Sequence, residues 1–268
     1  MFFRRLAALH LLRPLTAVCL LVALPACQPP QPAASTVASA PALAPIAVPP
    51  ALTAALAAYR AGGPKGWAYT QTSEGGGKNI VERFNPRFRG PTRWTLIKQD
   101  ERTPTEEELR DYRQKSVTKT DGDTASTVRD QLDLATCTLI AEEGRTSVYH
   151  FAIRPAVKED TAAVHMRAAF TLDRPTGTIT QVELFNFEPF SPVFTLKIDE
   201  ARTIMRYTLP EDGKPSLLSE ISMKLRGRRL WVRKFSEDMT MRFTEQSDAS
   251  TPSLAPSTVN TGPAIPQN

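Results

Sequence analysis

The stretch Val164-His-Met-Arg-Ala-Ala-Phe-Thr-Leu-Asp173 alternates between two kinds of side chain. Every even-numbered residue in it is apolar, whereas the odd-numbered residues include His165, Arg167 and Asp173. Successive side chains of a β-strand point to opposite faces, so this two-residue period predicts a strand with one dry and one wet face. The turn sequence Pro175-Thr-Gly177 follows, and we expect the chain to reverse there into an antiparallel neighbour.

The same period recurs along most of the chain, in segments 67–72, 79–84, 94–98, 148–153, 179–187, 194–199, 217–226, 230–235 and 239–243. A glycine turn, Gly75-Gly-Gly77, separates the first two. These segments predict about nine or ten antiparallel strands. Few of the intervals are long enough for crossover helices, which argues against a doubly wound α/β fold.

Three short segments predict helices. Helix formers with apolar spacing fill Ala51–Arg60. Thr103-Pro-Thr-Glu106 has the residues of a capping box, with Thr103 as the N-cap, Pro104 at the first helical position and Glu106 bonding back to the cap. We expect a further short helix around Thr127–Leu134.

The N-terminus has the features of an export signal. Arg4 and Arg5 precede an apolar run whose cleanest part is Leu15–Leu24. That run is too short for a membrane-spanning helix, which needs about 20 apolar residues. It is typical of the apolar region of a signal peptide, and we expect residues 1–26 to be removed.

The expected cleavage site, Leu24-Pro25-Ala26-Cys27, resembles the bacterial lipobox. The resemblance implies cleavage before Cys27, diacylglycerol on the Cys27 thiol, and acylation of the new α-amine, for example by palmitate. Two or more acyl chains anchor a protein stably. Gln28, rather than Asp, follows the cysteine, and by resemblance to known sorting this favours the outer membrane, facing the periplasm. A plain secretory site ending at Ala26 is the alternative.

The mature chain divides by composition. Residues 28–50 consist mostly of Pro, Ala, Ser, Thr and Gln, which cannot bury enough surface to offset the entropy of ordering. We expect a lipidated, disordered tether over 27–58, a single folded domain over 59–245, and a disordered tail over 246–268.

The formal net charge of +5 is concentrated in the leader, because Arg4, Arg5 and Arg13 account for three of these charges. Without the leader the chain is nearly neutral, whereas nucleic-acid-binding domains usually have a strongly basic balance. We expect no nucleic-acid partner.

The order of elements is informative: paired strands, Arg93-Trp-Thr-Leu96, a capped helix, then long antiparallel strands. Together with the lipobox, this order resembles the lipoprotein-carrier (LolA/LolB-like) half-barrel family of the bacterial envelope. The resemblance implies a mainly β (α+β) fold, in which a large curved antiparallel sheet or half-barrel lies over one or two short helices. It also implies an apolar cavity that takes acyl chains.

The apolar faces of the expected strands provide candidate cavity residues: Phe170, Leu172, Phe185, Phe194, Leu196, Ile198, Met223 and Leu225. These side chains can equally fill an ordinary core. Met223, Met239 and Met241 would make a cavity lining adaptable, although methionines also fill ordinary cores.

A basic cluster lies in the last long hairpin: Lys224, Arg226, Arg228, Arg229, Arg233 and Lys234. It can contact anionic lipid head groups or lipopolysaccharide phosphate. A solvated strand face is the alternative.

The screen for catalytic chemistry finds no motif. Cys137, His150 and His165 match no metal-ligand spacing, and no Gly-x-Ser-x-Gly elbow occurs. Gly75-Gly-Gly-Lys-Asn79 lacks the earlier glycine of a phosphate loop, and Asp121-Gly-Asp123 lacks the further ligands of a calcium loop. We expect no cofactor, no metal and no enzymatic activity.

The leading hypothesis is a membrane-anchored envelope lipoprotein that binds lipid or an acylated partner in an apolar cavity. The alternative is a structural or assembly module that docks onto another envelope protein through a sheet edge or the basic hairpin. A hydrolase using Cys137, His150 or His165 is the third hypothesis.

Overall fold

The structure is a computed structural model that describes residues 44–62, 65–116, 129–155, 160–230 and 232–249. The predicted signal peptide, lipobox and most of the tether and tail therefore lie outside the described residues, as does the Asp121-Gly-Asp123 turn. Within the described ranges, no helix is both long enough and apolar enough to cross a membrane.

The secondary structure is mostly β. The strands are β1 Trp67–Gly75, β2 Lys78–Phe84, β3 Trp94–Gln99, β4 Leu132–Glu143, β5 Thr146–Ile153, β6 Met166–Asp173, β7 Thr178–Asn186, β8 Phe190–Val193, β9 Leu196–Tyr207, β10 Leu218–Arg229 and β11 Arg233–Asp248. The helices are α2 Pro50–Ala58 and α3 Glu106–Ser116, with short 3₁₀ turns η1 Gly90–Arg93 and η2 Ala163–His165.

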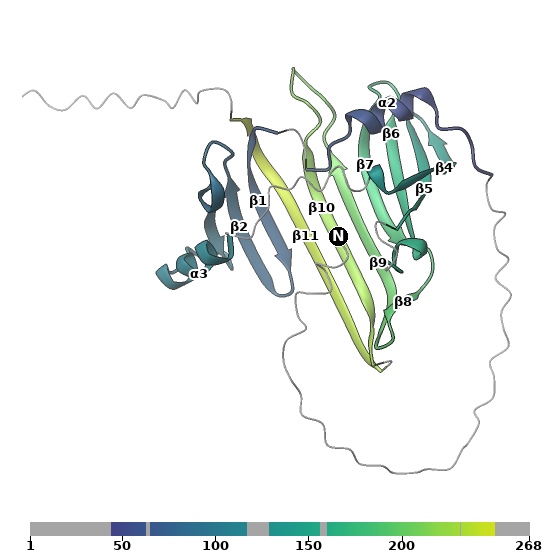
Figure 1. The fold of residues 1–268 in the computed structure, drawn as a ribbon. Coiled ribbons are helices and arrows are strands. Elements are labelled where there is room, and N and C mark those ends of the chain that lie inside the picture. The colour runs from purple at the N-terminus through teal and green to yellow at the C-terminus, as the bar shows by residue number, and fades with distance from the viewer. Residues whose placement is uncertain (1–43, 63–64, 117–128, 156–159, 231, 250–268) are drawn as a thin grey trace, which may run out of the picture.

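All strands belong to one antiparallel sheet in the order β3-β2-β1-β11-β10-β9-β7-β6-β5-β4, with the short β8 paired to β9. The sheet twists and curves along its length and is open, ending at β3 and β4 (Figure 1). The predicted mainly β fold with two short helices is thus confirmed.

Local turns and one distant pairing build this sheet. The β1–β2 hairpin turns at Gly76 and Gly77, whose φ angles of 58° and 74° are those that two-residue hairpin loops favour and glycine adopts without strain. Trp67 pairs with Asp248, so that the first and last strands lie side by side in the middle of the sheet.

Helix α2 is part of the core. Leu52 and Leu56 pack with strand residues that include Phe170, and Leu52 is fully buried. The ring of Tyr59 contacts that of Phe170 edge-on, with centroids 5.9 Å apart. The folded unit therefore begins before residue 59, where the composition placed the boundary, because alanine-rich sequence also suits a helix packed closely on a sheet.

Several segments differ from the predicted pattern. The strands expected over 230–235 and 239–243 form one strand, β11, which begins only at Arg233, and Val164 and His165 lie in η2 before β6. β4 begins at Leu132, so that the helix expected around Thr127–Leu134 ends in a strand; residues 127 and 128 lie outside the described part of the chain. The strand expected from residue 194 starts only at Leu196, since Phe194 lies in the turn between β8 and β9. Phe194 continues the alternation of Leu196 and Ile198, so the sequence does not distinguish this turn residue from a strand residue.

Helix α3 has its capping box two residues later than predicted. The Thr105 hydroxyl accepts from the Glu108 amide at 3.3 Å, and the Glu108 carboxylate accepts from the Thr105 amide at 2.8 Å. Both Thr-x-x-Glu pairs fit the motif. The Arg102 side chain selects the second pair, because its guanidinium donates to the same Glu108 carboxylate at 2.6 Å and 2.9 Å.

Candidate functional site

One face of the sheet carries apolar side chains from β6 to β11. The cross-strand pairs Phe170↔Val182↔Met205↔Ile221↔Met241 run from β6 to β11. Directly paired residues of antiparallel strands share a face. We call this face, which carries Phe170, the inner face.

The two helices lie toward opposite ends of the inner face. Helix α2 lies at the β4–β7 end and α3 at the β2–β3 end, with β11, β10 and β9 between them (Figure 1). The side chain of Tyr112 ties α3 to the face through Glu82, a carboxylate that is only 5% exposed. Burial and the nearby Glu82 carboxylate raise the pKa of Tyr112 well above its ordinary value, so the phenol stays neutral and donates.

Between the helices, six apolar side chains of β10 and β11 lie half-buried or exposed on the inner face. We call them the methionine strip: Ile221, Met223, Leu225, Met239, Met241 and Phe243. The strip is continuous with the buried core, because two of its members, Ile221 and Phe243, pack against core residues. Met239 is the most open of the six, with 37% of its surface exposed.

Polar and aromatic groups border the strip on the β1 side. The Gln71 amide donates to the Ser73 hydroxyl at 2.9 Å and points toward the Met241 sulfur at 3.8 Å. The rings of Tyr69 and Phe243 meet edge-on at 5.3 Å. The strip therefore offers an apolar surface with an amide and a hydroxyl at one margin.

The predicted cavity residues do not form one surface. Phe170 and Leu172 are buried in the main core cluster, whereas Ile198 is buried in a second, smaller cluster against which Leu196 packs. Only Met223 and Leu225 belong to the methionine strip.

Two of the predicted cavity residues lie elsewhere. Phe185 faces the opposite side of the sheet, where its ring meets that of His150 at 5.4 Å, because Leu184 takes the inner face. Phe194 is 83% exposed in the β8–β9 turn. No closed, tightly filled sandwich forms in the described ranges, since the sheet is single and open.

The opposite, outer face is charged, and several of its charges form ion pairs. Arg202 binds Glu183 at 2.8 Å, and Arg242 binds Glu74 at 3.0 Å. In high dielectric such exposed pairs add little stability, about 0–1 kcal/mol each. Their effect is to keep this face wet.

The basic cluster is divided between the two faces. Lys224, Arg226 and Arg228 lie on the outer face within 4 Å of carboxylates of β9: the first two beside Glu200 and the third beside Asp199. Arg229 and Arg233 pair with each other across the hairpin on the inner side, and Arg228 pairs with Lys234. Half of the cluster is thus neutralised locally, which the sequence order of charges did not predict.

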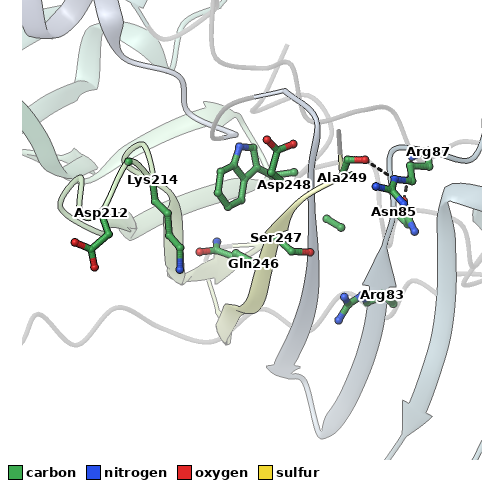
Figure 2. A pocket seen from close by; sticks show the side chains of 12 residues that line it. Arg83, Asn85, Arg87, Asp212, Lys214, Gln246, Ser247, Asp248 and Ala249 are labelled. Carbon is green, nitrogen blue, oxygen red and sulfur yellow. Dashed lines mark hydrogen bonds between the residues drawn. The ribbon is translucent and has the colours of Figure 1, made fainter. Parts of the chain in front are cut away.

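Two open pockets lie away from the methionine strip. The first, of about 670 Å³, lies where the end of β11 meets β1, β2 and the turn at Asp212–Lys214 (Figure 2). Its arginines are engaged: Arg87 donates to the Ala249 carbonyl oxygen, and Arg83 binds Glu245 at 2.5 Å. The second, of about 650 Å³, lies beside Gly227 and is lined by Arg226, Arg228, Lys234 and two carboxylates.

Cys137, His150 and His165 do not come together. Cys137 is fully buried in the core beneath α2, where burial raises the pKa of its thiol. Burial lowers the pKa of His150, which lies on the outer face against Phe185. His165 stacks on Phe190 and binds Glu188 at 2.9 Å. Among the residues described, no group of three or more His, Cys, Asp or Glu side chains is placed to hold a metal ion.

Met239 and Met241, which the sequence offered with Met223 as an adaptable lining, are two residues apart and lie on the inner face. A second feature of this face has no counterpart in the sequence. The Tyr112–Glu82 contact joins a helix to a strand through residues 30 positions apart, and no local signal marks it.

No protein-family profile matches the chain. No curated protein matches it in sequence. Among solved structures, a GphF dehydratase variant made for improved crystallization covers 72% of this chain and 81% of its own, at 10% identity and a TM-score of 0.16. An isomerase-inactive variant of GphF DH1 covers 76% and 82%, at 11% identity and a TM-score of 0.17. TM-scores this low carry no argument about fold or activity.

Proposed function

We propose that this protein is a membrane-anchored envelope lipoprotein, without enzymatic activity, that holds the acyl chain of a lipid or of an acylated partner on the methionine strip. The observation that carries the proposal is the position of the strip. It continues the apolar core onto β10 and β11, between the two regions that α2 and α3 occupy.

The chemistry of the strip suits a flexible apolar ligand. Three of its six side chains are methionines, which are unbranched and adapt to ligands of irregular shape. Each buried CH₂ group contributes about 0.8 kcal/mol, so that burying half of a C16 chain contributes about 6 kcal/mol before ordering costs. The Gln71 amide and the Ser73 hydroxyl at the margin can bond to an ester or amide near the head of the chain.

The anchor is a separate part of the proposal. Acylation of Cys27 would hold the chain on a membrane without a spanning helix. Mass spectrometry of the protein extracted from membranes should find diacylglycerol on Cys27 and no residue before it, and Cys27→Ser should abolish both. Intact retention of residues 1–26, or release at Ala26 without lipid, would refute the anchor.

The binding proposal is tested with the chain from Gln28 onward, which keeps every described residue. The probe is lysophosphatidylcholine below its micellar concentration, titrated by native mass spectrometry. Lysophosphatidylcholine has one acyl chain and no net charge. A substitution that introduces a charge therefore changes its affinity by disrupting the apolar surface, and not by attracting or repelling the head group.

A matched pair of variants locates the binding. Met239→Lys places a charge on the strip, whereas Thr240→Lys places the same charge one residue later, on the outer face beside Glu74. We expect Met239→Lys to raise the Kd at least about tenfold and Thr240→Lys to change it by less than about twofold. Equal effects, or no binding by the unmodified chain, would overturn the proposal and favour docking onto another envelope protein.

A further inference from the structure

Two turns meet at the end of the sheet opposite α2 (Figure 1). One joins β8 to β9 and the other joins β10 to β11. The backbone amide of Leu230 in the second turn donates to the carbonyl oxygen of Thr195 in the first, at 2.7 Å. We call the described residues of these two segments, which are 193–195, Leu230 and Val232, the paired turns.

The paired turns carry large apolar side chains exposed to solvent. Phe194 is 83% exposed, Val232 82%, Leu230 66% and Val193 57%. Scattered single apolar residues are ordinary on protein surfaces, whereas a contiguous group of them marks an interaction site. The hydrogen bond between Leu230 and Thr195 brings together the two turns that carry these four side chains, although they belong to different hairpins.

Basic side chains flank this apolar group in both hairpins. Residues 193–199 and 228–234 contain five basic side chains and one acidic one: Lys197, Arg228, Arg229, Arg233, Lys234 and Asp199. The single carboxylate is within 3.4 Å of Arg228. In the described part of the chain, no ion pair engages Arg229, Arg233 or Lys234, and Arg229 lies over the Phe235 ring at 5.6 Å.

We infer that the paired turns insert into the anionic surface of a lipid bilayer. An apolar tip enters the boundary between head groups and acyl chains, and the surrounding cations bind the negatively charged head groups. A protein partner would need a negatively charged, concave apolar site of matching shape. A bilayer presents both properties together, and the charge complementarity selects it.

The geometry is compatible with an anchor at Cys27. Sixteen residues separate Cys27 from Ala44, and at about 3.4 Å per residue they can extend to about 54 Å. The sixteen residues of β11 span a similar length, about 54 Å. The anchor and the paired turns can therefore reach the same bilayer.

The inference deepens the proposed function without requiring it. Leu225, at one end of the methionine strip, packs with Phe235 against the small core cluster near the paired turns. This end of the strip is therefore the one nearer to the paired turns. Insertion of the paired turns would place the Leu225 end of the strip next to the acyl chains of the bilayer. Binding of lysophosphatidylcholine and binding of bilayers are separate measurements, so that either can fail alone.

The test uses the chain from Gln28 onward and vesicles of phosphatidylcholine with or without 30% phosphatidylglycerol, separated by flotation. We expect binding to the anionic vesicles, weakened at least about tenfold by Phe194→Ser with Val232→Ser, and similarly by Arg233→Gln with Lys234→Gln. The matched controls are Phe88→Ser with Ile97→Ser, which are 54% and 43% exposed elsewhere, and Arg110→Gln with Arg113→Gln on α3. Controls should bind like the unmodified chain.

A second measurement separates insertion from surface attraction. An NBD fluorophore on Val232→Cys should brighten and shift to the blue on anionic vesicles, whereas the same fluorophore on Phe88→Cys should not. Cys137 is fully buried and does not compete for labelling. The inference is overturned if no vesicles are bound, if the tip variants bind like their controls, or if inorganic phosphate displaces the protein while the Val232→Cys probe stays unchanged.

Discussion

The hydroxyl groups of Tyr59 and Tyr207 lie 2.7 Å apart in the core, where the end of α2 meets β9. The Tyr207 hydroxyl donates its proton to the Ala61 carbonyl oxygen at 3.0 Å, so Tyr59 must be the donor in the pair. The pair joins the segment after α2 to a strand nearly 150 positions later. It fixes the end of the helix against the sheet by two buried hydrogen bonds.

The direction of these bonds predicts unequal costs for removing the two hydroxyls. Tyr207→Phe leaves the Tyr59 donor and the Ala61 oxygen unpaired, and we expect it to lower the free energy of unfolding by about 2–3 kcal/mol. Tyr59→Phe leaves the bond to Ala61 intact and should cost about 1 kcal/mol. Urea unfolding of both variants measures the difference, and equal costs would show that the bond direction is wrong.

The same pair predicts alkaline sensitivity. Burial raises the pKa of both phenols well above 10 in the folded chain, while an unfolded tyrosine ionises near 10. The contribution of the neutral pair is present below about pH 10 and decreases as the pH rises through that value. The urea midpoint should therefore fall more steeply above pH 10 in the unmodified chain than in the Tyr59→Phe, Tyr207→Phe double variant.

Helix α2 should be essential for the folded unit. Leu52→Ala removes a fully buried side chain and should cost about 3 kcal/mol. Ala54→Ser, on the exposed side of the same helix, should change the free energy of unfolding by less than about 0.5 kcal/mol. A chain beginning at Tyr59 that unfolds at the same urea concentration as the longer one would contradict this role of α2.

The capping box of α3 predicts sensitivity to acid. The Arg102 guanidinium and then the Thr105 amide lower the pKa of Glu108 to about 2, compared with an ordinary value of 4.5. The stability that this carboxylate contributes is present above pH 4.5 and is lost as the pH falls toward 2. Glu108→Gln should therefore lower the urea midpoint at pH 6 and have a smaller effect at pH 3.

The control for this prediction is Glu107→Gln, which changes the same charge on the first turn of α3 without removing the contacts to Arg102 and Thr105. It should show a smaller difference between the two pH values. If both variants respond alike, the effect belongs to the helix terminus in general and not to the capping box.

Gly227 is required by the close packing of the hairpin near the paired turns. A Cβ atom there would overlap the Lys197 carbonyl oxygen and lie 2.8 Å from the Phe235 ring. Gly227→Ala should therefore cost about 2 kcal/mol or more in urea unfolding. Gly144→Ala meets no neighbour within 4 Å and should cost about 1 kcal/mol, from its positive φ of 52° alone.

The sequence predicted the elements better than the site because an element is encoded locally. The alternation in Val164–Asp173 indicates a strand wherever its neighbours lie, and Gly76 and Gly77 supply the φ angles of their turn without help from the rest of the chain. The cavity residues failed to form one surface for the opposite reason. Phe185 is apolar but lies on the outer face of the sheet, one residue away from an inner-face position. Phe194 lies in a turn whose position depends on how β8 pairs with β9.

What the sequence by itself determined is the period of each strand, the turns between neighbours and the apolar character of one face, because covalent geometry and side-chain hydropathy act over a few residues. Only the tertiary structure decided what covers that face. Trp67 had to meet Asp248 for β1 and β11 to lie in the middle of the sheet. With α2 toward one end and α3 toward the other, the methionine strip stays open between them, a result of distant pairings that no local pattern contains.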